Sequence, residues 1–180
     1  MKMVGYLSAT KEGIIGESGV FYNYILGAGG LYVRAENPLI RATICIAPAE
    51  VRGLVPVEEK IDLVHGKIPR RLYELVLSVL IAEAREERYL AITWNNGYHI
   101  ACPPQIGTVA SVEYEPLQGT VLDIHSHGGM PAFFSGTDNR DDQGMRFSMV
   151  LGKLAEAPEY LMRLTVYGYY ADIDFDEVFL

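Results

Sequence analysis

Two histidines at the end of an apolar, β-prone stretch are the feature that most constrains this chain. Residues 119–124 read Gly-Thr-Val-Leu-Asp-Ile, a composition typical of a strand, and His125 and His127 follow directly with one residue between them. Because side chains on a strand alternate between its two faces, both imidazoles are expected on one side and Ser126 on the other. The pattern predicts two nitrogen ligands that share a face.

A hydroxyl and a carboxylate follow at short distance. Seven residues separate His127 from Ser135, and Asp138 comes three positions later. If this loop folds back, Asp138 completes a site of two nitrogens and one oxygen, which zinc accepts while keeping a fourth position for water. The alternative is a pair of ordinary histidines at a strand end, with Ser135 and Asp138 capping the next helix. The two interpretations are compatible, since Ser135 can begin a helix whose first turn carries Asp138.

Size and charge favour a small enzyme or binding domain over a nucleic-acid-binding protein. The chain has 180 residues, 49% of them hydrophobic, enough for one well-buried core and a small extension. A formal net charge of −8 argues against a nucleic-acid partner. No apolar run approaches the roughly 20 residues that span a bilayer, so we expect a cytoplasmic protein without a membrane partner.

The chain divides near Pro69. Residues 1–68 are expected to form a β-rich extension and connector. Strands at 20–26 and 31–35 flank the glycine-rich turn 27–30 as a hairpin, and 39–46 adds a third strand. Residues 50–67 have mixed character and are expected to be a loop.

Residues 69–180 predict a second domain. Pro69 begins an amphipathic helix that runs to about Glu86. Strands are expected at 88–94, 98–102, 108–115 and 119–125, then a short helix to about residue 143 and strands at 147–151 and 161–170. This order predicts an α+β domain with a mostly antiparallel sheet flanked by helices.

The spacing His-x-His, seven residues, Ser-x-x-Asp resembles the JAMM motif of the JAB/MPN metalloprotease superfamily, in its bacterial Prok-JAB type. The resemblance implies a cytidine-deaminase-like fold and a zinc ion held by His125, His127 and Asp138. It also implies hydrolysis of peptide or isopeptide bonds after ubiquitin-like proteins. Gly128 departs from the family pattern, which usually has proline after the second histidine; the change loosens the loop without removing a ligand.

The same resemblance implies a glutamate upstream as general base, and Ser135 as a hydrogen-bond donor to the oxyanion. Three residues compete for the glutamate role. Glu83 lies inside the expected helix and is better read as a solvated charge. Glu87 stands at the helix-to-strand transition, where the family has its glutamate, and Glu86 is the alternative because element boundaries shift by a few residues.

A narrower resemblance covers most of the chain. Residues 31–37, 46–53, 125–135 and 166–170 are similar to the protein A family of the bacterial PRTRC cassette. That likeness implies a neighbouring E1-like, ThiF-related protein and a ubiquitin-like or sulfur-carrier-like partner. Two functions follow: a zinc-dependent peptidase or isopeptidase acting at a C-terminal Gly-Gly tail, or a non-catalytic MPN-type interaction or scaffold module. Retention of every motif residue favours the enzyme.

Overall fold

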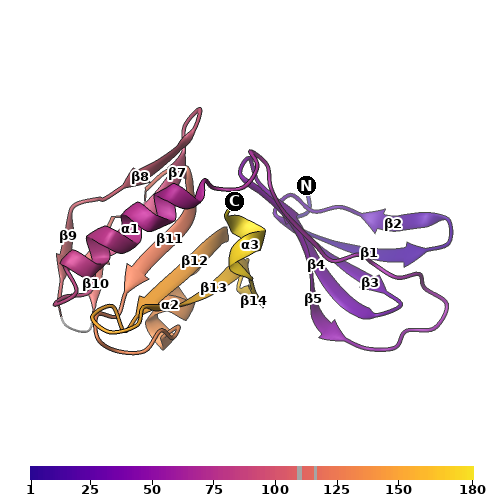
Figure 1. Ribbon diagram of the computed structural model, residues 1–180. Coiled ribbons are helices and arrows are strands. Elements are labelled where there is room, and N and C mark those ends of the chain that lie inside the picture. Colours follow the sequence, from indigo (N-terminus) through magenta and orange to yellow (C-terminus); the bar gives the residue numbers. More distant parts are fainter. Residues whose placement is uncertain (109–110, 116) are drawn as a thin grey trace. The chain divides into compact units, whose positions relative to one another are not determined.

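The computed structural model describes residues 1–108, 111–115 and 117–180. It contains two compact units, Met1–Gly66 and Lys67–Leu180 (Figure 1). Within the described residues, no helix has the length and apolar character needed to cross a membrane.

The N-terminal unit is a six-stranded sheet in the order β2-β1-β3-β4-β5-β6. The expected hairpin is confirmed: β3 and β4 pair antiparallel, with Gly27 opposite Gly30 and two residues in the turn. Neighbouring strands are antiparallel except for β1 and β3, which run parallel. The strands are β1 (Val4–Thr10), β2 (Gly13–Glu17), β3 (Tyr22–Gly27), β4 (Gly30–Glu36), β5 (Ile40–Pro48) and β6 (Lys60–Leu63).

The expected loop over residues 50–67 is wrong in its last part, because β6 lies there and pairs antiparallel with β5. A four-residue strand carries little periodic signal of its own, and the backbone of β5 supplies the pairing partner that the sequence does not reveal. The segment before β6 crosses one face of the sheet. Val55 donates its N–H to the Ala9 carbonyl and accepts from Ala28, both at 2.9 Å. Val55 and Val57 pack there against a small core of Ala9, Ile25 and Tyr32.

The C-terminal unit contains a second six-stranded sheet, in the order β14-β13-β12-β11-β7-β8. All neighbours are antiparallel except β11 and β12, so the expected mostly antiparallel sheet is confirmed. β9 and β10 form a separate antiparallel pair. The strands are β7 (Tyr89–Trp94), β8 (Tyr98–Ala101), β9 (Gln105–Gly107), β10 (Val112–Tyr114), β11 (Thr120–Ser126), β12 (Met145–Gly152), β13 (Glu159–Val166) and β14 (Tyr169–Asp172).

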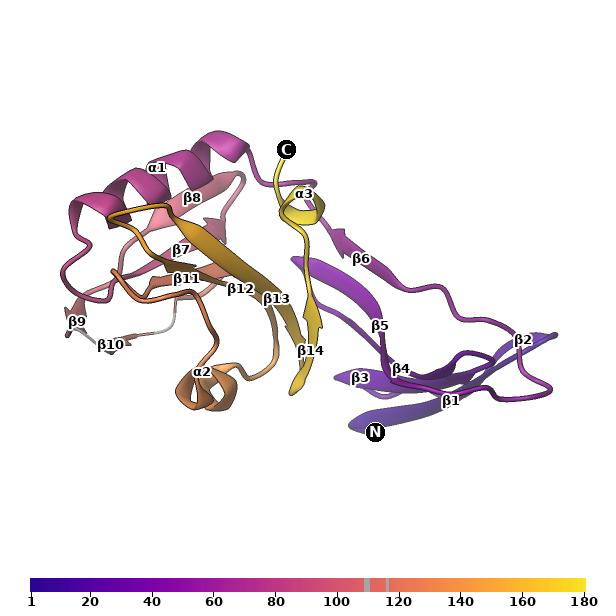
Figure 2. The ribbon, with the colours of Figure 1, turned by 60° about the horizontal axis from the view of Figure 1, so that its bottom comes forward.

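The helices that flank this sheet are sparser than expected. The long helix α1 (Arg70–Ala82) and the short α2 (Gly136–Asp141) lie on opposite sides of the sheet in Figure 2. A further turn of helix, α3 (Phe175–Val178), follows the last strand and was not expected from the sequence. The unit is therefore an α+β fold dominated by its sheet.

The first helix ends earlier than its apolar pattern suggests. The last helical hydrogen bond runs from the Glu83 N–H to the Val79 carbonyl, so the helix does not reach Glu86. Val76 and Leu80 are buried, whereas Leu75, Val79 and Ile81 are 43–55% exposed. The chain leaves the helix early because it must turn back to enter β7, and this places residues 83–88 in a turn and an extended connector.

Two further expectations are corrected. The single strand predicted over 161–170 is a hairpin of β13 and β14, because Tyr167 and Gly168 both have positive φ angles, 49° and 88°, as a two-residue turn between antiparallel strands requires. The strand predicted over 108–115 is shorter, with β10 spanning Val112–Tyr114; residues 109 and 110 of that prediction lie outside the described residues.

Candidate metal centre

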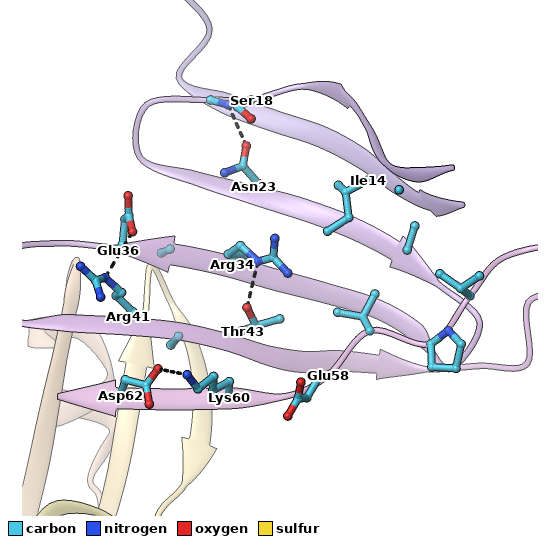
Figure 3. A pocket seen from close by; sticks show the side chains of 18 of the residues that line it. Ile14, Ser18, Asn23, Arg34, Glu36, Arg41, Thr43, Glu58, Lys60 and Asp62 are labelled. Atoms are coloured by element: carbon cyan, nitrogen blue, oxygen red, sulfur yellow. Dashed lines mark hydrogen bonds and ion pairs between the residues drawn. The ribbon is translucent and has the colours of Figure 1, made fainter. Parts of the chain in front are cut away.

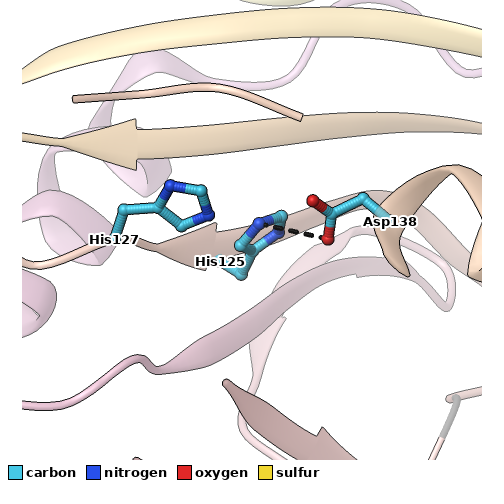
Figure 4. Close-up of side chains that lie close together, drawn as sticks. All are labelled: His125, His127 and Asp138. Carbon is cyan, nitrogen blue, oxygen red and sulfur yellow. Dashed lines mark ion pairs between the residues drawn. The ribbon is translucent and has the colours of Figure 1, made fainter. Parts of the chain in front are cut away.

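The three predicted ligand residues come together at the end of β11. This strand pairs with β7 on one side and β12 on the other, so His125 stands on a strand that is paired along both edges. His127 follows the strand, and its N–H donates to the Leu151 carbonyl at 2.7 Å. Asp138 comes from the first turn of α2 (Figure 4). One ligand atom from each of His125, His127 and Asp138 lies within 4.8 Å of the others.

His125 presents a buried nitrogen that the protein itself does not satisfy. Its Nε2 is 3.5 Å from Asp138 Oδ1 and, among the described residues, has no hydrogen-bond partner. Burial lowers the pKa of His125 to about 4, against a smaller opposing effect of Asp138, so the ring is neutral near pH 7. A buried polar atom without a partner costs free energy, and a metal ion on this lone pair would remove the cost. The two nitrogens and one oxygen, together with this unbonded nitrogen, fit zinc.

A hydrogen bond holds His127 in an orientation suited to metal binding. Its Nδ1 lies 3.3 Å from the Pro131 carbonyl oxygen, an acceptor to which the Nδ1–H donates. This contact leaves Nε2 as the lone-pair nitrogen, the arrangement common in metal-binding histidines. Burial lowers the pKa of His127 as well, which favours the neutral ligand form.

Ser135 and Asp138 form a capping box at the start of α2. Ser135 Oγ accepts from the Thr137 and Asp138 N–H groups, both at 3.2 Å, and Asp138 Oδ2 accepts from the Ser135 N–H at 2.5 Å. The cap therefore uses one oxygen of Asp138 and leaves Oδ1 facing His125. Ser135 keeps its hydroxyl hydrogen for another acceptor. The helix-capping and metal-binding interpretations hold together in one structure.

Glu87 is the buried member of the three candidate glutamates. It is 6% exposed and lines the same cavity as the two histidines, a space of about 360 Å³. Burial, with a smaller contribution from the negative charge of Asp138, raises the pKa of Glu87 to about 7. Glu83 and Glu86 are exposed and pair with Arg88 at 2.8 and 3.4 Å. Geometry thus brings Glu87 to the site, and leaves Glu83 and Glu86 on the surface.

The apolar loop 130–134 forms part of the cavity wall, and contacts within its own unit hold it in place. Lys153 donates its N–H to the Met130 carbonyl at 2.8 Å, and the Ala132 N–H donates to Glu159 Oε1 at 2.9 Å. The Phe133 ring meets the His127 ring edge-on at 4.4 Å between centroids, yet Phe133 remains 45% exposed. The loop therefore shields one imidazole and offers an aromatic surface beside it.

A buried ion pair that sequence reasoning missed anchors α2. Asp142 follows the helix and accepts from Arg163 Nε and Nη2 at 2.9 and 2.6 Å, and from the Ser148 and Thr165 hydroxyls. The Arg163 guanidinium also stacks on the Phe134 ring, 3.8 Å from its centroid. Asp142 is the residue that follows the last turn of α2, so it does not act as an acid of the first helical turn. A lone arginine within the apolar strand 160–166 was the available signal.

The backbone conformation at position 128 explains why this chain has glycine where the family usually has proline. Its φ angle is 55°, in the left-handed region, and a Cβ at this position would lie 2.7 Å from the Ala84 carbonyl oxygen. Proline, whose φ is held near −65°, cannot adopt this conformation. The turn after His127 therefore packs directly on the connector between α1 and β7.

Comparison with known proteins gives one family. Residues 47–165 match the model of the prokaryotic homologs of the JAB domain. The match begins near the end of β5 and runs through α1, the candidate metal centre and most of β13. No match was found among curated proteins.

Proposed function

The chain belongs to the family of prokaryotic JAB domain homologs, and on that premise we propose that it is a zinc-dependent hydrolase of peptide or isopeptide bonds. The superfamily includes hydrolases, and family membership alone does not distinguish them from non-catalytic members. The observation that carries the proposal is the buried Nε2 of His125, which has no hydrogen-bond partner among the described residues and lies beside His127 and Asp138 in a cavity that Glu87 also lines.

In this proposal His125, His127 and Asp138 hold the metal. A bound zinc ion lowers the pKa of a coordinated water and polarises a carbonyl oxygen. Both imidazoles are held neutral by burial, so they do not need to lose protons to become ligands.

Glu87 serves as the proton carrier. With a pKa of about 7 it is partly ionised near neutral pH. A carboxyl group tuned to the working pH can accept a proton from the attacking water and return it to the leaving amine, because neither transfer is steeply uphill. A carboxylate with a lower pKa would accept the proton from the attacking water less readily.

Ser135 supplies a hydrogen-bond donor. Its oxygen is fixed by two backbone N–H groups of α2, so the hydroxyl is already oriented before substrate arrives. Donation to the carbonyl oxygen as negative charge develops would stabilise the transition state without reorganisation.

We infer that the substrate is the C-terminal Gly-Gly tail of a ubiquitin-like or sulfur-carrier-like protein. The cavity is small, about 360 Å³, and aromatic side chains of the 130–134 loop line it. An extended chain reaches such a site most easily where its residues lack side chains, which favours glycine on either side of the scissile bond. The exposed face of Phe133 would then contact the globular part of the partner. An E1-like, ThiF-related protein that activates the same tail is the expected companion.

The experiment is cleavage of a sulfur-carrier-like protein extended beyond its Gly-Gly tail, with products identified by mass spectrometry. We expect cleavage after Gly-Gly by the zinc-loaded protein, loss of cleavage with a chelator, and no cleavage of an Ala-Ala tail. Glu87→Gln should retain zinc and lose cleavage, whereas the matched surface variant Glu86→Gln should behave as wild type.

Chelator-insensitive cleavage would contradict a metal-dependent mechanism. Binding of the tail without cleavage, by protein shown to contain zinc, would instead favour the non-catalytic MPN-type interaction module. Ser135→Gly tests the donor separately, since glycine at a helix N-cap costs only a few tenths of a kcal/mol. Loss of one oxyanion donor is expected to reduce kcat by about 10²–10³.

A further inference from the structure

The N-terminal unit contains a cavity of its own, of about 730 Å³, lined entirely by residues between Ala9 and Asp62. A row of polar side chains crosses it. Asn23, Arg34, Thr43 and Lys60 lie opposite one another on the consecutive strands β3, β4, β5 and β6 (Figure 3). Cross-strand partners in register present their side chains on the same face of a sheet, so this row forms one continuous polar surface.

Among the arginine and lysine side chains that line the cavity, Arg34 has no acidic partner in the described part of the chain. Arg41 lies 3.6 Å from Glu36, and Lys60 lies 2.7 Å from Asp62. Arg34 makes a different contact: its Nε donates to Thr43 Oγ1 at 3.0 Å, and no ion pair joins it to any described carboxylate. This bond orients the guanidinium and leaves its two terminal nitrogens as donors. Two parallel N–H groups match the two oxygens of a carboxylate.

Asn23 adds a second donor next to Arg34. Its Oδ1 accepts the Gly19 N–H at 2.8 Å, which fixes the orientation of the amide and leaves the NH₂ group as donor. Gly5 makes room for this arrangement, because a Cβ there would lie 2.0 Å from Asn23 Oδ1. Both oriented groups in the middle of the cavity therefore present hydrogen-bond donors, and a ligand that fits them must offer acceptors.

Part of the cavity wall is apolar, and the rest carries charged side chains, among them Glu36, Glu58 and Asp62. Ile14, Val20 and Phe21 line one side and are 43–53% exposed, and Val55 and Val57 line another. Figure 3 shows Ile14 on the same side of the sheet as Arg34. A cavity that combines oriented polar groups with an apolar wall is a common form of a small-ligand site, and a volume of about 730 Å³ lies in the usual range.

We propose that this cavity binds a carboxylate attached to an apolar group, with the carboxylate on Arg34 and Asn23 and the apolar group against Ile14 and Val55. Two sources have this chemistry: the free C-terminus of a peptide that ends in an apolar residue, and a free N-acyl amino acid. The site is independent of the metal centre, since none of its residues belongs to that centre.

The test is titration of the full-length protein, observed in amide and arginine Nε–H signals by NMR. The probes are acetyl-Gly-Gly-Val-Leu with a free carboxylate, acetyl-leucine, and the C-terminal amide of each. We expect both acids to shift the Arg34 Nε–H signal and both amides to fail. Tighter binding of the peptide identifies a chain terminus as the ligand, and equal binding identifies the free acid.

Variants assign the effect to Arg34. Arg34→Gln should weaken binding of the acids about tenfold or more, as expected for loss of a charge-assisted pair. Arg52→Gln is the matched control, because Arg52 is 93% exposed, pairs with Glu50 and does not line the cavity. Thr43→Val keeps the charge of Arg34 and removes the acceptor that orients it, so a smaller loss of affinity for the acids is expected. This variant tests the proposal even if Arg34→Gln fails to fold.

Several outcomes would overturn the proposal. Equal binding of acids and amides would show that the cavity does not recognise the carboxylate. Tighter binding of inorganic phosphate at the same signals would contradict carboxylate recognition as well. Absence of any shift at millimolar probe, in protein whose spectrum is well dispersed, would exclude the site. Wild-type affinity in Arg34→Gln would exclude the residue.

Discussion

Replacing Glu87 by glutamine should stabilise the metal-free C-terminal unit while it removes hydrolysis. The carboxyl group is buried, and its pKa is raised from 4.5 to about 7. Below pH 4.5 the carboxyl group is neutral in both the folded and the unfolded chain, so it does not change the free energy of unfolding. Between pH 4.5 and 7 the unfolded chain releases this proton and the folded chain keeps it, so stability falls as pH rises. Above pH 7 the full cost of the buried charge remains.

The magnitude follows from the shift. At 1.36 kcal/mol per pH unit, the cost is on the order of 3 kcal/mol at pH 8 and about 1 kcal/mol at pH 5. Glutamine has nearly the same shape and no charge, so Glu87→Gln should recover most of this difference. The gain should therefore be larger at pH 8 than at pH 5.

Urea unfolding followed by tryptophan fluorescence measures this directly. The chain has a single tryptophan, and Trp94 lies in β7 of the C-terminal unit, so the signal reports that unit alone. The protein is freed of metal, and Glu86→Gln serves as the control because Glu86 is exposed and pairs only on the surface. A gain in Glu87→Gln that is equal at the two pH values, or no gain, would refute the burial argument.

Three further predictions follow from the site. His127→Ala should abolish stoichiometric zinc binding. Wild-type protein should hold zinc as pH falls through 6.5 and lose it closer to 4, because burial lowers the pKa of both histidines and that of His125 to about 4. Metal analysis after dialysis checks both predictions. Gly128→Ala should lower the free energy of unfolding by about 2 kcal/mol, because alanine disfavours a φ of 55° and its Cβ would meet the Ala84 carbonyl. Gly129→Ala has open space around the new Cβ and should change the free energy of unfolding little in the same urea assay. Arg163→Met should cost about 3 kcal/mol, because it removes the cation that donates directly to buried Asp142 and leaves only Arg146, whose Nε lies 3.8 Å from Asp142 Oδ1. The same variant should weaken zinc binding through α2, whereas Arg140→Met on the exposed side of that helix should do neither; calorimetric zinc titration separates the two variants.

The geometry of the candidate metal centre could be predicted in large part from the sequence, because its causes are local. Strand alternation alone puts His125 and His127 on one face, and a capping box alone fixes Asp138 relative to Ser135. Each relation spans at most three residues. The sequence does not decide whether the loop after His127 folds back, nor which of the three glutamates lies at the site. The choice of glutamate depends on where α1 ends and on what covers Glu87.

The errors in the fold have different origins. The β13–β14 turn has a local signal, Gly168, but the strand-forming aromatic residues Tyr167 and Tyr169 on either side of it favour one continuous strand. The strand β6 has no such signal, and only its pairing with β5 reveals it. Asp142 and Arg163 are 21 residues apart, and nothing between them in the chain indicates that they meet.

The sequence alone was enough to predict the candidate ligand residues, the spacing of the motif, the hairpin around Ala28 and the family to which the chain belongs. The tertiary structure alone decided which glutamate is buried, what holds α2 in place, and that Asn23, Arg34 and Thr43 form a row on one face. The reason is physical. A hydrogen-bond cap or a strand face is defined by neighbours along the chain, whereas burial, a pKa shift and a cross-strand row exist only after distant segments have packed together.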